Sequence, residues 1–136
     1  MEAYAERKKD LLQELYAMEP EQVKISTPED AVVQFLRYRS KKIEHFFSLS
    51  VDNKNNLIKR HELQRGTVDQ CALYVQEVIK ATLRCDGSGI ILGHNHPGGD
   101  PYPSKQDQEV TCQMVKAAKI MGFRVLDHII VAKHGH

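Results

Sequence analysis

Residues 90–107 read IILGHNHPGGDPYPSKQD and predict three kinds of local structure in succession. The apolar run Ile90–Gly93 predicts a short strand that is covered on both faces. The glycines and prolines of residues 94–103 predict a loop. Ser104 then predicts the start of a helix that extends to about Met121.

The chemistry of this segment lies in two histidines and one aspartate. His94 and His96 are two residues apart, so their side chains leave extended backbone on the same side. Asp107 lies three residues into the next helix, whose first turn the loop can bring back beside the strand. Three protein ligands leave one position of a tetrahedral zinc ion open, as in catalytic sites. We therefore predict one zinc ion, bound by His94, His96 and Asp107, that activates water for hydrolysis.

The same residues are also compatible with roles other than zinc binding. Ser104 and Asp107 form the S-x-x-D pattern of a helix capping box, which alone is more often a cap than a metal site. An isolated H-x-H pattern in a strand is only weakly specific for a metal site. Two histidines and a carboxylate also bind non-haem iron, although iron oxygenases usually place the second histidine far along the chain. The combination of all these features in this order favours zinc.

The rest of the chain predicts a sheet flanked by helices. Residues 43–51 and 57–64 show strand periodicity and flank the turn residues 52–56, which predicts a hairpin. Helices are predicted over residues 2–18, 28–39 and 69–84, and a last strand over residues 123–132. This order of elements predicts an α/β or α+β fold. We expect residues 1–24 to form an N-terminal helix and linker, and residues 25–136 to form one domain.

The helix predicted over residues 28–39 has a clear start. Thr27 can cap it, Pro28 suits its first position, and Asp30 can complete a capping box. We expect this helix to bury four apolar side chains, which are Val32, Val33, Phe35 and Leu36.

Composition limits the class of protein. At 136 residues, with 41% hydrophobic and 27% charged residues, the chain fits one globular domain. Its net charge of +1 does not favour nucleic acid as a partner, since nucleic-acid-binding domains usually carry a basic excess. No apolar run is long enough to span a membrane and the first residues do not form a signal peptide, so we expect a cytoplasmic protein without a membrane partner.

The spacing of the site residues resembles the JAMM motif of JAB/MPN metalloproteins, E…H-x-H-x7-S-x2-D. Seven residues separate His96 from Ser104, and two separate Ser104 from Asp107. The stretches GHNHPGGDPYPSKQD, EHFFSLSVDNKNNLI and MGFRVLDHIIV are similar to the bacterial RadC family, and the similarity extends over about residues 25–133. The resemblance implies the MPN fold, a curved mixed sheet between helices, with zinc as the cofactor.

The resemblance also implies roles for individual residues. The zinc ligands would be His94, His96 and Asp107, the general base Glu44, and the donor to the developing oxyanion Ser104. From the residues alone, Glu44 is more simply an exposed strand carboxylate, and Glu62 on the paired strand is a rival base. His128 also matches a RadC-like feature, and we expect it to lie in the core or behind a ligand.

The activity that the resemblance implies is hydrolysis of an amide or isopeptide bond in a protein or peptide substrate. Two alternatives stay open, a DNA-binding protein associated with DNA repair and a catalytically silent MPN scaffold. Silent MPN domains typically lose ligands, whereas all five motif positions are filled here. The identity of the substrate and the oligomeric state do not follow from the sequence.

Overall fold

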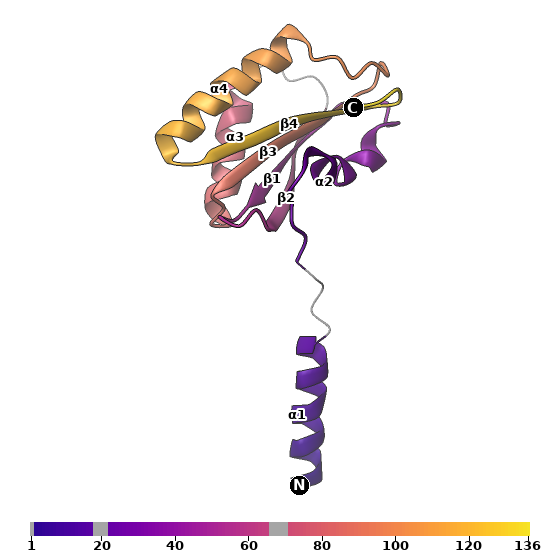
Figure 1. Ribbon diagram of the computed structural model, residues 1–136, viewed down its shortest axis with the longest axis vertical. Coiled ribbons are helices and arrows are strands. Elements are labelled where there is room, and N and C mark those ends of the chain that lie inside the picture. Colours follow the sequence, from indigo (N-terminus) through magenta and orange to yellow (C-terminus); the bar gives the residue numbers. More distant parts are fainter. Residues whose placement is uncertain (1, 18–21, 66–70) are drawn as a thin grey trace.

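Within residues 2–17, 22–65 and 71–136, which the computed structural model describes, the chain forms a four-stranded sheet with helices on both faces (Figure 1). The elements are, in chain order, α1 (Glu2–Ala17), α2 (Pro28–Val33), the 3-10 helix η1 (Leu36–Tyr38), β1 (His45–Val51), β2 (Leu57–Arg65), α3 (Cys71–Arg84), β3 (Gly89–His96), α4 (Lys105–Met121) and β4 (Arg124–Ala132). This architecture confirms the predicted mixture of helices and strands and agrees with a JAB/MPN-like fold.

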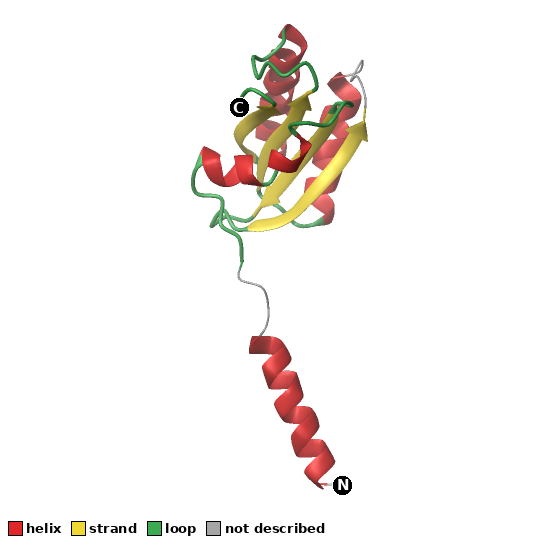
Figure 2. Cartoon of the chain, turned by 90° about the vertical axis from the view of Figure 1, so that its right-hand side faces the viewer, coloured by secondary structure: helices red, strands yellow, loops and turns green. Residues whose placement is uncertain are grey.

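The sheet is mixed, as the resemblance implied. Its strands, which Figure 1 labels, lie in the order β2-β1-β3-β4, and Figure 2 shows the same sheet after a turn of 90°. β1 is antiparallel to both β2 and β3, whereas β3 and β4 are parallel and are connected through α4. The predicted hairpin is therefore confirmed as β1 and β2. In its turn, Oδ1 of Asp52 accepts hydrogen bonds from the N–H groups of Lys54 and Asn56.

Two apolar clusters hold the helices on the sheet. α3 and α4 cover one face, where Phe46 and Met114 are buried. α2 and η1 cover the other face, where Phe35 and Phe47 are buried. Because side chains alternate along a strand, the neighbours Phe46 and Phe47 each enter a different cluster. β1 is thus buried on both faces.

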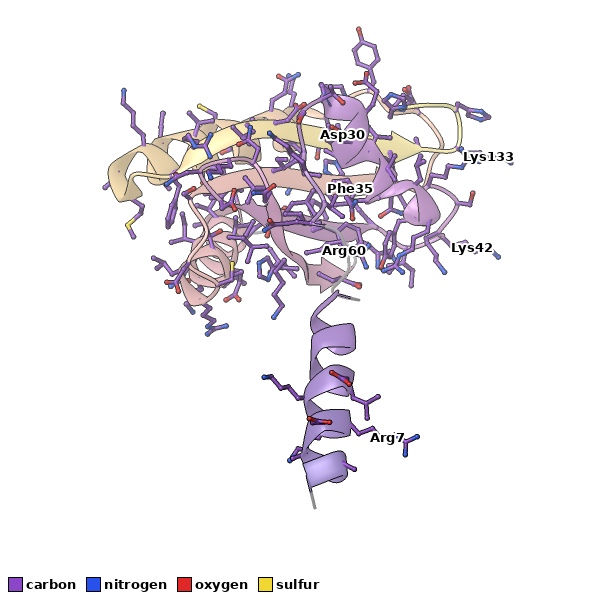
Figure 3. All side chains as sticks on the ribbon, turned by 60° about the horizontal axis from the view of Figure 1, so that its bottom comes forward. Arg7, Asp30, Phe35, Lys42, Arg60 and Lys133 are labelled. Atoms are coloured by element: carbon purple, nitrogen blue, oxygen red, sulfur yellow. The ribbon has the colours of Figure 1, made fainter. Side chains whose placement is uncertain are left out.

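The helix predicted over residues 28–39 is shorter than expected. α2 ends at Val33, and the tighter helix η1 follows. Val33 and Leu36 are 64% and 38% exposed, so the prediction that both are buried is wrong. The reason is that Phe35 and Tyr38, which are three residues apart, both turn onto the sheet, as the period of a 3-10 helix allows. Figure 3 shows Phe35 against the strands.

β3 extends beyond the predicted Ile90–Gly93 and includes both histidines of the H-x-H pattern. His94 lies opposite Phe46 on β1 and opposite Ile130 on β4. The backbone around His94 thus pairs with two neighbouring strands. This pairing depends on segments far away in the sequence, so the local glycines and prolines could not predict it.

The N-terminal helix α1 lies apart from the sheet in Figures 1 and 2. Residues 18–21, and residues 66–70, where the predicted start of α3 falls, lie outside the described residues. The predicted division between residues 1–24 and 25–136 stays a prediction. In the part of the chain that the structure describes, no helix has both the length and the apolar character needed to cross a membrane.

The absence of a side chain at Gly93 lets the ring of Phe35 pack directly on β3. A Cβ at this position would lie 2.5 Å from Cζ of the buried Phe35 ring. We expect Gly93→Ala to lower the free energy of unfolding by about 2 kcal/mol, a cost typical of an overpacked core. In the matched control Gly98→Ala, the added methyl meets no atom within 4 Å, and the change should stay below about 0.5 kcal/mol. Equal urea midpoints for the two variants would contradict this packing.

Candidate metal centre

Four side chains that offer metal-ligating atoms meet where β1 begins, β3 ends and α4 begins. They belong to Glu44, His94, His96 and Asp107, and their ligating atoms all lie within 4.8 Å of one another. The three predicted zinc ligands and the predicted base are thus brought to one place. Across the described residues, no second group of three or more such side chains comes together.

Strand register builds this cluster. Phe46 on β1 pairs with His94 on β3, and both side chains face α4. Glu44 and His96 each lie two residues away from that pair, so the period of a strand brings them to the same face. α4 covers this face, and the first turn of α4 supplies Asp107. His94 is fully buried, whereas Glu44 and His96 are half-buried.

The imidazole rings and the carboxylate lie within contact distance of one another. Nε2 of His94 is 2.9 Å from Nε2 of His96. The oxygens of Asp107 are 3.2 Å from Nε2 of His94 and 3.0 Å from Nε2 of His96. Oε1 of Glu44 is farther away, at 4.0 Å from Nε2 of His94. Three ligating atoms therefore face one point, with a second carboxylate just beyond them.

The hydrogen bond of Nδ1 decides which ring nitrogen of His96 can bind a metal ion. Nδ1 of His96 lies 2.9 Å from the carbonyl oxygen of Asp100. A carbonyl oxygen only accepts, so Nδ1 carries the hydrogen. In the neutral ring, Nε2 then presents its lone pair to His94 and Asp107. This is the state in which a histidine binds a metal ion.

α4 begins with a capping box that includes the site carboxylate. The N–H of Asp107 donates to Oγ of Ser104 over 3.0 Å, and the N–H of Ser104 donates to Oδ2 of Asp107 over 2.9 Å. The predicted box of Thr27 and Asp30 at the start of α2 has the same form. Asp107 therefore caps a helix and faces the two imidazole rings at once. The S-x-x-D pattern is thus compatible with a helix cap and with a metal ligand at the same time.

The two carboxylates of the cluster differ in acidity. Partial burial raises the pKa of Glu44 above its ordinary value. Burial also acts to raise the pKa of Asp107, but its contact with the His94 ring and the N–H of Ser104 outweigh burial, so the pKa lies well below its ordinary range. Asp107 is thus ionised at neutral pH, as a metal ligand must be. Glu44 takes up a proton more readily, which suits an acid–base group.

This donor set fits zinc. Two imidazole nitrogens and one carboxylate oxygen are ligands of zinc in catalytic sites, whereas magnesium and calcium prefer oxygen alone. Two hollows give access to the cluster from outside. One, of about 410 Å³, is lined in part by Glu44, His96 and Ser104, and the other, of about 650 Å³, in part by His128. Asp107 lines both.

Glu62, the rival base, faces the opposite side of the sheet. Its Oε1 lies 2.9 Å from Nδ1 of His45. The ring of His45 stacks on Phe47, which belongs to the cluster under α2. The structure therefore brings Glu44 to the site and places Glu62 elsewhere.

Asn95 has a position that sequence reasoning missed. Its fully buried carboxamide accepts a hydrogen bond from the N–H of His45 over 2.6 Å and donates one to the carbonyl oxygen of Ile43 over 3.0 Å. These bonds hold the backbone on both sides of Glu44. A signal was present, because a carboxamide between the two histidines of a buried strand needs partners.

His128 lies behind one of the histidines, in agreement with the sequence-based expectation. Its Nε2 is 2.9 Å from Nδ1 of His94. Burial lowers the pKa of His128 to about 3, so this ring is neutral at physiological pH. It is not one of the four clustered side chains.

Comparisons with known proteins place this site in a family context. The profile of the RadC-like JAB domain family matches residues 25–136. A UPF0758 protein of Coprothermobacter proteolyticus is 40% identical over 121 residues, which cover 85% of this chain and 52% of that protein. A UPF0758 protein of Caldanaerobacter subterraneus is 40% identical over 114 residues, which cover 82% of this chain and 48% of that protein. The chain thus spans about half the length of these relatives, and their names state no activity.

The cap at Ser104 predicts a measurable contribution to stability. Ser104→Ala removes the acceptor of the Asp107 N–H, and we expect the free energy of unfolding to fall by about 1 kcal/mol. Ser104→Gly should cost only a few tenths of a kcal/mol, because glycine is tolerated at this position. Urea unfolding of metal-free protein measures both changes. A Ser104→Ala variant as stable as the wild type would show that the hydroxyl does not cap α4.

Proposed function

Because this chain belongs to the family of RadC-like JAB domains, we propose that it is a zinc-dependent hydrolase of amide or isopeptide bonds. One observation carries the proposal. The lone pair of His96 Nε2, Nε2 of His94 and the carboxylate of Asp107 meet at one point, and a half-buried glutamate lies beside them. We propose His94, His96 and Asp107 as the ligands of a single zinc ion.

Glu44 is the proton carrier in this proposal. A zinc ion at the site would polarise the substrate carbonyl and lower the pKa of a water molecule toward about 7. Glu44 accepts the proton of the attacking water and delivers it to the nitrogen that leaves as the C–N bond breaks. The raised pKa of Glu44 supports this role, since a base works best when its pKa approaches the working pH.

Ser104 is the proposed donor to the oxygen of the substrate carbonyl. Its Oγ accepts the hydrogen bond of the Asp107 N–H with a lone pair, so its own hydroxyl hydrogen remains available to donate. Ser104 also lines the hollow of about 410 Å³ beside Glu44 and His96. Hydrogen bonds of this type to a developing negative charge contribute about 3 kcal/mol to catalysis.

We propose a protein or peptide as the substrate class. Amide and isopeptide bonds occur in extended chains, and the two hollows that Asp107 lines offer room for a peptide chain beside the cluster. The alternatives of a DNA-binding protein and of a silent scaffold stay predictions, as does a cytoplasmic location.

Zinc content tests the ligand set. We expect the purified wild type to contain about one zinc ion per chain and His96→Ala to lose most of it, because two ligands alone bind weakly. His134→Ala is the control, since His134 lies in an exposed turn outside the cluster. Elemental analysis of the three proteins, with circular dichroism to verify folding, measures the effect. Equal zinc in wild type and His96→Ala would remove His96 from the ligand set.

Glu44→Gln tests the proton carrier. The variant should retain zinc but lose about 100-fold to 10,000-fold in turnover of amide- and isopeptide-linked peptides, because a carboxamide cannot accept the proton. Glu62→Gln should retain turnover, since its carboxylate faces the other side of the sheet. If Glu44→Gln turns over substrate at the wild-type rate, another group must be the base.

A further inference from the structure

Behind the candidate metal centre, a chain of hydrogen bonds connects His94 to α4. Nδ1 of His94 lies 2.9 Å from Nε2 of His128 on β4. Nδ1 of His128 lies 2.6 Å from Oγ1 of Thr111 on α4. The Thr111 hydroxyl is in turn 2.9 Å from the carbonyl oxygen of Asp107. The chain begins at one proposed ligand and ends on the backbone of another.

The direction of each hydrogen bond follows from the last acceptor. The carbonyl oxygen of Asp107 only accepts, so the single hydroxyl hydrogen of Thr111 points to it. Oγ1 of Thr111 must then accept from His128, which places the hydrogen of His128 on Nδ1. A neutral imidazole carries a single ring hydrogen, so with that hydrogen on Nδ1 the Nε2 of His128 is a bare acceptor. Nδ1 of His94 therefore carries a hydrogen and donates it to His128.

This direction decides what His94 offers to the cluster. With its hydrogen on Nδ1, the neutral ring of His94 presents the lone pair of Nε2 to His96 and Asp107. The opposite tautomer would present an N–H there, which no cation can bind. His96 reaches the same state through a simpler contact, the carbonyl oxygen of Asp100.

We propose that His128 and Thr111 are positioning residues that set the tautomer and the ring orientation of His94 for metal binding. The part of this inference that concerns metal rests on the proposed function. The part that concerns the tautomer rests only on the hydrogen bonds. Without an acceptor behind it, the fully buried Nδ1–H of His94 would lose its partner, and the tautomer with Nε2–H, donating to Asp107, would be favoured.

Thr111→Val is the decisive variant, because it removes the hydroxyl while it retains the size and branching of the side chain. We expect its dissociation constant for zinc, measured by competition with a chromophoric chelator, to rise about 10-fold to 100-fold, as is typical when a partner behind a ligand is removed. Thr111→Ser keeps the hydroxyl and should stay within about 3-fold of the wild type. His128→Gln, which keeps an acceptor for His94, should bind zinc more tightly than His128→Phe.

The tautomers themselves are read from long-range ¹H–¹⁵N spectra of the metal-free wild-type chain. We expect a hydrogen on Nδ1 of both His94 and His128, and loss of the single His128 tautomer in Thr111→Val. A hydrogen on Nε2 of His128 in the wild type would overturn the inference, and so would unchanged zinc affinity in Thr111→Val. A wild type that shows the expected tautomers but binds no zinc would instead refute the proposed function and leave the hydrogen-bond chain in place.

Discussion

The pairing of β1 with β3 is the constraint on which the candidate site depends. Phe46 lies opposite His94, and this one register places Glu44, His94 and His96 under the first turn of α4. A slip by one residue would turn both histidines toward α2, since side chains alternate across a strand. The carboxamide of Asn95 holds the register from the other face of the sheet.

The hydrogen-bond partner of Nδ1 in each imidazole ring decides whether Nε2 presents a hydrogen or a lone pair to the cluster. If both rings carry their hydrogens on Nδ1, then two lone pairs face each other across 2.9 Å beside an ionised carboxylate. Three acceptors at this range repel one another in a partly buried place, and a positive charge between them removes that repulsion. The carbonyl oxygen of Asp100, which accepts from His96, and that of Asp107, where the chain from His94 ends, would thus favour a cation at the site.

Local chemistry predicted those parts of the structure that depend on neighbours in sequence. The strand, loop and helix around the H-x-H pattern and the capping boxes at Thr27 and Ser104 are of this kind. The remaining features depend on contacts between segments that are far apart in the sequence. Whether Glu44 or Glu62 reaches the histidines depends on which face of β1 lies under α4, and alternation alone does not contain that information. The length of β3 and the exposure of Val33 likewise depend on contacts with other elements.

The double position of Asp107 connects the start of α4 with the affinity that the candidate metal centre would have for an ion. The oxygen that closes the first turn of α4 is also the oxygen that faces His96, so helix initiation and ion affinity draw on the same electron pairs. Occupancy of the centre and order in the first turn of α4 are then thermodynamically linked. Removal of a bound ion by a chelator would then increase the rate of amide hydrogen exchange in the first turn of α4. A substitution that weakens the start of the helix would lower the affinity for the ion.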